Sequence, residues 1–281
     1  MNTKKILIFF YKKLSKIYIF FFGRKKMQIL NDLILSLSLN AKGYKNYGKP
    51  SSTGEKNFIK LIRKRLNFCI DIGANIGKYS ELLIHETNSQ IIAFEPLPKA
   101  FDELQVMEKK FSSRFKAYNF AIGDKNCNLD LNFGSETSEL ASFSKNLDKL
   151  SFVNHKNNKK IEVKVITLDT FFEKFNITYA EKGIDLLKID TEGFELEVLR
   201  GASNTLINKI PKFIQIEYNW HQLFKSQTIY NFSEILSNYE VFQILPFGNN
   251  LVKVDPSRPE SNIFHLSNFV FIRKDISREY E

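Results

Sequence analysis

Residues 71–77, with the sequence DIGANIG, constrain the fold more than any other segment of this 281-residue chain. They lie between an apolar run and an amphipathic stretch. An apolar strand that turns through glycines into a helix presents free backbone N–H groups to an electron-rich ligand group. The spacing differs from Gly-x-Gly-x-x-Gly, which disfavours a pyrophosphate-binding turn. We therefore expect a ligand-binding turn formed by Asp71, Gly73, Asn75 and Gly77, with an ordinary glycine-rich turn as the alternative.

The chain after residue 55 alternates strand and helix patterns. This alternation is typical of a parallel sheet with crossover helices, and it predicts a doubly wound, seven-stranded α/β domain over residues 56–281. The expected strands are 67–72, 90–95, 115–122, 184–190, 212–217, 240–245 and 268–273. The expected helices are 77–86, 98–110, 168–175, 194–199 and 229–238, and segments 129–133 and 161–166 are expected to form an inserted hairpin.

Acidic side chains follow three of the predicted strands, at the sheet edge where ligands bind in such folds. Glu95 ends the second strand, where a carboxylate can accept hydrogen bonds from both ribose hydroxyls of an adenosine. Asp124 follows the third strand and is expected either to contact an adenine amino group or to cap the next segment. Asp190 and Glu192 follow the fourth strand, and two adjacent carboxylates can divide into an ionised base and a protonated partner. Helix capping by Glu192 is the alternative.

A polar and aromatic segment, residues 217–221, follows the fifth strand and is expected to line an acceptor site. Its His221 is a third candidate for a catalytic base beside Asp190 and Glu192, although a lone histidine is more often structural. The histidines and the two cysteines show no metal-ligand spacing, so the sequence predicts no metal site. Two cysteines in unlike contexts also make no disulfide framework, which favours a reducing, cytoplasmic location.

Residues 1–55 differ from the rest and are expected to form a basic, apolar helical extension. The first 26 residues carry eight basic side chains and no acidic one, in a chain of net charge +10. Two six-residue apolar runs, 6–11 and 17–22, are too short to cross a bilayer. At about 100° per residue the lysines gather on one side of a helix, opposite a broad apolar surface. This pattern favours packing on the core or on a second copy of the chain in a homo-oligomer. Binding of residues 1–26 to an anionic surface at the inner face of a membrane is the alternative.

Four segments in order resemble the FkbM-type methyltransferases, namely residues 71–80, 94–96, 121–124 and 187–202. The similarity spans about residues 66–220 and does not extend to the first 55. The resemblance implies a class I methyltransferase fold with S-adenosylmethionine as the methyl donor, held by the turn and by the acids that follow the second and third strands. It also implies O-methylation, commonly of sugars or of polyketide-type hydroxyls. A carbohydrate or glycan precursor is therefore the expected acceptor.

Two other functions are alternatives. The positive charge would suit an RNA methyltransferase, but residues 190–193 lack the Asp/Asn-Pro-Pro-aromatic loop used to methylate base amino groups. Cys69 and Cys127 do not lie in the loop that carries the nucleophile for cytosine C5 methylation, so nucleic acid is a disfavoured partner. A non-catalytic scaffold at the membrane would be expected to lose Asp71, Gly73, Gly77 and Glu95 first, and these residues are present.

Overall fold

The computed structural model describes residues 3–48, 52–135, 137, 140–143, 157–177, 181–248 and 251–281, with backbone only for residues 3–8. The chain divides into two compact units, Met1–Lys42 and Gly43–Glu281. The sequence analysis places the division at residue 55, whereas in the structure it falls earlier, after Lys42. Tyr44 is fully buried and donates a hydrogen bond from its hydroxyl to the carbonyl of Glu260 at 3.0 Å. The described part of the segment between the two positions therefore packs with the larger unit.

The larger unit is built on an eight-stranded sheet in the order β10-β9-β11-β8-β7-β1-β2-β3. The strands are β1 (Phe68–Ile72), β2 (Gln90–Phe94), β3 (Phe115–Tyr118), β7 (Leu186–Ile189), β8 (Phe213–Tyr218), β9 (Tyr239–Ile244), β10 (Leu251–Lys253) and β11 (Ser267–Arg273). Neighbours from β3 to β8 are parallel, and β11 is antiparallel to both β8 and β9. The doubly wound α/β prediction is confirmed, with β10 as an eighth strand that the sequence analysis did not include.

A smaller sheet in the order β4-β6-β5 stands beside the main one. Its strands are β4 (Ala121–Ile122), β5 (Cys127–Phe133) and β6 (Lys159–Ile166), and β5 pairs with β6 as the expected antiparallel hairpin. The predicted third strand, 115–122, is wrong as a single element. It breaks after β3, and β4 leaves the main sheet to pair with β6.

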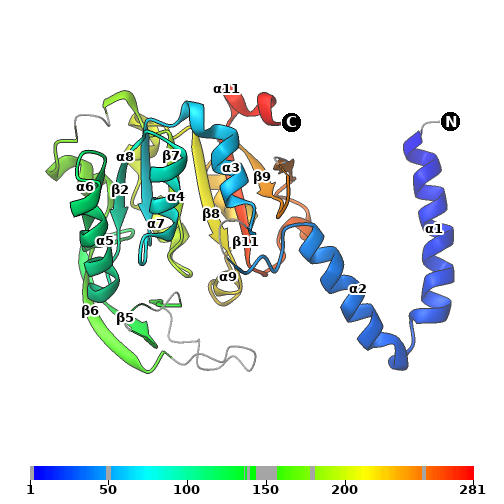
Figure 1. Ribbon diagram of the computed structural model, residues 1–281. Helices are drawn as coiled ribbons and strands as arrows, with labels where there is room; N and C mark the ends of the chain where they lie inside the picture. The colour runs from blue at the N-terminus through cyan, green and yellow to red at the C-terminus, as the bar shows by residue number, and fades with distance from the viewer. Residues whose placement is uncertain are drawn as a thin grey trace. The chain divides into compact units, whose positions relative to one another are not determined.

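Helices cover both faces of the main sheet (Figure 1). They are α3 (Glu55–Ile62), α4 (Lys78–Glu86), α5 (Pro98–Lys110), α6 (Leu168–Lys174), α7 (Glu195–Arg200), α8 (Ser203–Asn208), α9 (His221–Lys225), α10 (Ile229–Ile235) and α11 (Lys274–Ser277). Helices α3, α4 and α5 share one core with alternate residues of β1, β2, β7 and β8. On the opposite face Phe171 of α6 contacts Phe94, and Phe232 of α10 contacts Tyr218. Central strands buried on both faces explain the continuous apolar runs in the sequence.

The smaller unit consists of α1 (Thr3–Phe22), a short 3₁₀ turn and α2 (Gln28–Ala41), as the predicted helical extension requires. The two helices are tied near their junction. The Tyr18 hydroxyl donates to Oδ1 of Asn31 at 2.7 Å, and Nδ2 of Asn31 donates to the carbonyl of Phe22 at 3.0 Å. Within the described residues, no helix combines the length and apolar character needed to cross a membrane.

Candidate active site

The face of the sheet covered by α3 and α4 changes from apolar to polar along its strands. Cys69, Leu186 and Phe213 belong to the core on that face. Because side chains alternate with a period of two, the residues two positions further along each strand lie on the same face. Those residues are Asp71, Lys188 and Gln215, and the strand register places Asp71 beside Lys188 and Lys188 beside Gln215. One more step of two gives Gly73, Asp190 and Glu217 at the carboxyl edge.

This polar end of the sheet opens into a cavity of about 500 Å³. Its walls come from the ends of β1, β7 and β8, the starts of α3 and α4, and the segment before α3. The lining includes Asn46, Tyr47, Thr53, Glu55, Asp71, Gly73, Asn75, Lys78, Tyr79, Lys188, Asp190, Glu192, Glu217, Asn219, Trp220 and Asn268. A smaller cavity of about 60 Å³ beside Glu95 shares Gly73, Asn75, Asp190 and Glu192 with the first. The two cavities therefore adjoin at the predicted ligand-binding turn.

A hydrogen-bonded network holds the floor of the large cavity. The Tyr79 hydroxyl donates to Oε1 of Gln215 at 2.6 Å. The amide nitrogen of Gln215 donates in turn to Glu55 at 2.8 Å and to Asn268 at 2.9 Å. Thr53 completes the chain with a bond to Glu55 at 2.9 Å. Buried polar groups with all partners present rigidify a site, so this floor is a preorganised surface.

Lys188 is the buried cation of the site. Its Nζ lies 2.8 Å from Oδ2 of Asp190 and 5.3 Å from the centre of the Tyr79 ring. Burial lowers the pKa of Lys188, but the surrounding carboxylates, led by Asp190 and Glu55, raise it by more, so that the net shift is upward. The ammonium group is therefore charged at neutral pH and partly balances the acids around it.

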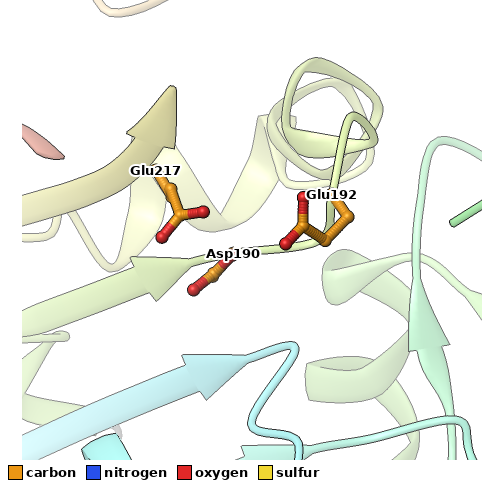
Figure 2. A group of neighbouring side chains, drawn as sticks. All are labelled: Asp190, Glu192 and Glu217. Carbon is orange, nitrogen blue, oxygen red and sulfur yellow. The ribbon is translucent and has the colours of Figure 1, made fainter. Parts of the chain in front are cut away.

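Three carboxylates converge at the end of the sheet (Figure 2). Asp190 and Glu217 extend from the ends of β7 and β8, and Glu192 lies on the following loop. One oxygen from each carboxylate lies within 4.8 Å of one oxygen from each of the other two. Burial and repulsion from Asp190 raise the pKa of Glu192 and of Glu217 well above the ordinary value. Like charges this close resist full ionisation, so proton binding by Glu192 and Glu217 is favoured.

The same three carboxylates form a donor set of the kind that hard divalent cations prefer. The sequence analysis predicts no metal site because it considers histidine and cysteine spacing, and Glu217 joins Asp190 and Glu192 only through the pairing of β7 with β8. Convergence of acids is equally suited to holding protons, and Lys188 already supplies a positive charge beside Asp190.

The loop that carries Glu192 is held under backbone strain. Glu192 has φ 51°, in the left-handed region that side chains other than glycine rarely adopt. The Glu195 carboxylate fixes the loop by accepting hydrogen bonds from the backbone N–H groups of Thr191 at 2.9 Å and Gly193 at 3.0 Å. Strained residues held by their surroundings are concentrated at functional sites.

His221 lies behind Glu192 and is outside the lining of both cavities. Its side chain is 2% exposed, and Nε2 is 3.0 Å from Oε2 of Glu192. Burial lowers the pKa of His221 to about 4, so the ring is neutral near pH 7. Asn219 contacts the same carboxylate, with Nδ2 donating to Oε2 of Glu192 at 3.0 Å. The structure thus places His221 beside Glu192 and outside both cavities, a position that fits the structural alternative in the sequence analysis better than a base in contact with a ligand.

Glu95 follows β2 directly and lines the smaller cavity. Its Oε2 accepts the backbone N–H of Asn75 and its Oε1 accepts that of Leu97, both at 2.8 Å. Burial raises the pKa of Glu95 to about 7, partly offset by these two hydrogen bonds. Each carboxylate oxygen retains a further acceptor position. The side chain can thus still accept two hydroxyl donors from a ligand in the smaller cavity.

Asp71 and Gly73 define the junction of the two cavities. Oδ2 of Asp71 accepts a hydrogen bond from Ser80 at 2.7 Å, and burial raises the pKa of Asp71 to about 6. Gly73 has φ 81°, and a Cβ atom there would lie 1.7 Å from the carbonyl oxygen of Asp190. The backbone of Asp190 therefore occupies the space that a side chain at position 73 would need.

Two predicted donor-binding residues lie away from the cavities. Asp124 is exposed and belongs to neither lining. Gly77 begins α4 with φ 86°, and a Cβ atom there would meet Leu104 and Met107 of α5. Its role is helix packing, while Asp71, Gly73, Asn75 and Glu95 do line the cavities as expected.

Sequence reasoning missed several lining residues. Lys188 received no role in the sequence analysis. The alternation of side chains along neighbouring strands, followed from Asp71, places Lys188 on the same face of the sheet and could have identified it. Glu55 and Tyr79 come from the starts of α3 and α4, whose approach to the sheet edge is a tertiary feature. The expected contribution of residues 217–221 is present through Glu217, Asn219 and Trp220.

The chain is similar in sequence to known methyltransferases. The family model described as the methyltransferase FkbM domain matches residues 71–244. "Methyltransferase 1" of Beauveria bassiana is 29% identical over 49% of this chain and 59% of its own length. The "2-O-methyltransferase NoeI" of Sinorhizobium fredii is 22% identical over 77% of this chain and 91% of its own length. The "Hexuronic acid methyltransferase AglP" of Haloferax volcanii is 27% identical over 54% of this chain and 58% of its own length.

The chain thus spans less than two thirds of the length of the Beauveria and Haloferax relatives. Among solved structures, an FkbM methyltransferase from Methylobacillus flagellatus aligns with a TM-score of 0.46 at 17% identity, over 74% of this chain and 44% of that one.

Proposed function

Since the chain belongs to the FkbM methyltransferase family, we propose that it transfers a methyl group from S-adenosylmethionine to a hydroxyl oxygen of a carbohydrate or glycan precursor. The observation that carries the proposal is the pair of adjoining cavities. The smaller cavity is lined by a buried acid, Glu95, whose oxygens retain acceptor positions, and the larger one is lined by three closely spaced acids.

The donor would lie across the junction of the two cavities. When bound, S-adenosylmethionine supplies an electrophilic methyl group on a sulfonium centre. Glu95 is suited to the two ribose hydroxyls, and Asp71 to an ammonium group. The large cavity carries the carboxylates of Glu55, Asp71, Asp190, Glu192 and Glu217 against the amines of Lys78 and Lys188. A surplus of negative charge suits a ligand with sulfonium and ammonium groups.

The acidic cluster would take the proton that the acceptor hydroxyl loses. A carboxylate with a raised pKa is a better base near neutral pH than an ordinary one. Both Glu192 and Glu217 have this property and line the large cavity. Lys188 pairs with Asp190 beside them, and a hydrogen bond from Asn219 fixes the position of Glu192. These residues align the acceptor and remove its proton, while proximity supplies much of the acceleration.

A carbohydrate acceptor is supported by the names of two relatives and by the cavity wall. One relative is named for 2-O-methylation and another for a hexuronic acid. The larger cavity, of about 500 Å³, has room for an acceptor beside one end of the donor molecule. Its lining includes the aromatic side chain of Trp220 and the amide side chains of Asn46 and Asn219, which suit a hydroxyl-bearing ring. The acidic lining disfavours RNA, whose phosphates it would repel.

The proposal is tested in two steps. Calorimetric titration of the purified chain with S-adenosylmethionine should show saturable binding, and a scaffold without donor affinity would show none. Mass spectrometry of glycans from cells with and without the gene should then reveal one added methyl group per modified sugar. If the chain instead transferred a labelled methyl group from S-adenosylmethionine to RNA, and its binding to RNA weakened steeply as salt rises, the substrate would be a nucleic acid.

A further inference from the structure

Helix α1 exposes a large apolar surface on a unit of its own. The exposed fractions of Phe10, Leu14, Ile17 and Phe21 are 58%, 64%, 57% and 57%. At about 100° per residue these four side chains fall within one arc of the helix. We call them the apolar arc of α1. Exposed apolar surface of this extent marks an interaction site rather than an ordinary helix face.

The rest of α1 carries exposed lysines among further apolar side chains. Lys12 and Lys16 lie roughly opposite the apolar arc, and Lys13 lies at its flank. Ile19 and Phe20 are also exposed on that side. Arg24, Lys25 and Lys26 follow directly after the helix and are also exposed. The first acidic residue of the chain is Asp32, in α2. The unit therefore combines an aromatic-rich apolar arc with uncompensated positive charge.

Helix α2 continues the apolar surface. Ile29, Leu33 and Leu37 are spaced four residues apart and are 78%, 58% and 69% exposed. Side chains at this spacing share one face of a helix. The hydrogen bonds between Tyr18, Asn31 and the carbonyl of Phe22 hold the start of α2 against the end of α1. Both helices thus present apolar side chains within one tied unit.

We propose that the Met1–Lys42 unit binds the surface of an anionic lipid bilayer. The apolar arc would enter the boundary between headgroups and acyl chains, and the basic side chains would meet the lipid phosphates. Long lysine side chains can place their amines in water while their methylene stems lie along the apolar region. In this arrangement the helices would lie along the bilayer surface.

Charge favours lipid over a second copy of the chain as the occupant. The first 26 residues carry eight basic side chains and no acidic one. Pairing two such segments brings like charges together, whereas an anionic bilayer neutralises them. The apolar arc would be covered in either arrangement, so the electrostatic difference decides between them.

The test measures binding of the full chain to vesicles by co-sedimentation. Vesicles of phosphatidylcholine and phosphatidylglycerol in equal parts are compared with phosphatidylcholine alone. Binding is expected only to the anionic vesicles and should weaken as salt rises. The triple variant Lys12→Gln, Lys13→Gln, Lys16→Gln should bind on the order of a hundred-fold more weakly. The variant Phe10→Gln, Leu14→Gln, Phe21→Gln should lose binding while retaining the unfolding transition of the larger unit.

The matched control removes the same charge elsewhere. Lys64, Lys109 and Lys174 are exposed on the larger unit, and their triple replacement by Gln should leave vesicle binding nearly unchanged. Equal loss in both triple variants would overturn the proposal, because it would show a general charge effect. Equal binding by the Lys12, Lys13 and Lys16 variant and the unchanged chain would also overturn it. So would a salt-insensitive dimer that dissociates only when the apolar arc is replaced and binds no vesicles.

Discussion

The buried carboxylates of the site have two kinds of surroundings: Glu95 is hydrogen-bonded to backbone N–H groups, whereas Glu192 and Glu217 are close to other carboxylates. Glu95 has a backbone N–H group on each oxygen, so its position is determined whether or not a ligand is present. Glu192 and Glu217 instead lie close to each other and to Asp190, with Asn219 between them. A satisfied carboxylate is suited to recognition, whereas carboxylates in mutual repulsion are suited to exchanging protons. The difference supports the proposal that Glu95 binds the donor and that the three clustered carboxylates take part in proton transfer.

Removing the buried cation should give the largest effect. Lys188→Met leaves the acidic cluster without its positive charge, and breaking a buried ion pair costs about 3–5 kcal/mol of unfolding free energy. Denaturant unfolding at pH 8 measures this loss, which should shrink at low pH as the carboxylates take up protons. Lys212→Met is the control, because that lysine is 35% exposed and its partner Asp185 keeps two backbone hydrogen bonds. Equal losses in the two variants would mean that the cluster does not depend on Lys188.

Glu95→Ala should weaken S-adenosylmethionine binding by about 1.5–3 kcal/mol for each ribose hydrogen bond lost. It should also lower stability, because the N–H groups of Asn75 and Leu97 lose their acceptor. Calorimetry reports the affinity and thermal unfolding reports the stability. Glu103→Ala, at an exposed position of α5, should change neither. Unchanged donor affinity in a folded Glu95 variant would remove Glu95 from the donor site.

The acidic cluster should make stability fall as pH rises. The pKa values of Glu192 and Glu217 are raised in the folded state, so the folded chain binds protons more tightly than the unfolded chain. Their stabilising contribution is complete below the ordinary glutamate pKa and is lost as pH rises toward the raised values. Glu217→Gln should flatten this dependence in denaturant unfolding measured from pH 5 to pH 8, and should slow methyl transfer. A curve parallel to that of the unchanged chain would show that Glu217 ionises normally.

The smallest effect is expected at Asp124. Its side chain is exposed and outside both cavities, so Asp124→Asn should change donor affinity by no more than about 0.5 kcal/mol. Calorimetry under the conditions used for Glu95 gives the comparison. A loss as large as that of the Glu95 variant would restore the adenine contact suggested by the sequence.

The sequence predicts the fold well where patterns are local. Alternating strands and helices are sufficient for a doubly wound sheet, and glycines at a strand end locate the turn at Asp71. The position of Asp124 depends instead on where the third strand breaks. Asn119 and Phe120 separate β3 from β4, and the residues beyond them follow the smaller sheet rather than the main one. The break depends on the pairing of β4 with β6, which lies about 40 residues later in the chain, and a local sequence pattern does not reveal that pairing.

The acidic cluster shows the same limit in another form. Asp190 and Glu192 follow one strand, but Glu217 joins them only because β7 and β8 are neighbours in register. Gly73 also has a tertiary role that its motif hides. The motif suggests close approach to a ligand, whereas a Cβ atom there would meet the Asp190 carbonyl. Gly73→Val would therefore distort the ends of β1 and β7 together, beyond any effect on the donor.

Because the backbone of Asp190 lies directly against Gly73, the turn at Gly73 and the acidic cluster would move together. A ligand that orders the turn at Gly73 must also restrict the backbone of Asp190, and an acceptor that orders Asp190 must restrict the turn. Each ligand then meets a partly ordered site once the other has bound. Coupling of this kind is reciprocal, so the first ligand raises the affinity for the second by the same factor in either order. The site would thus favour the ternary complex over either binary one.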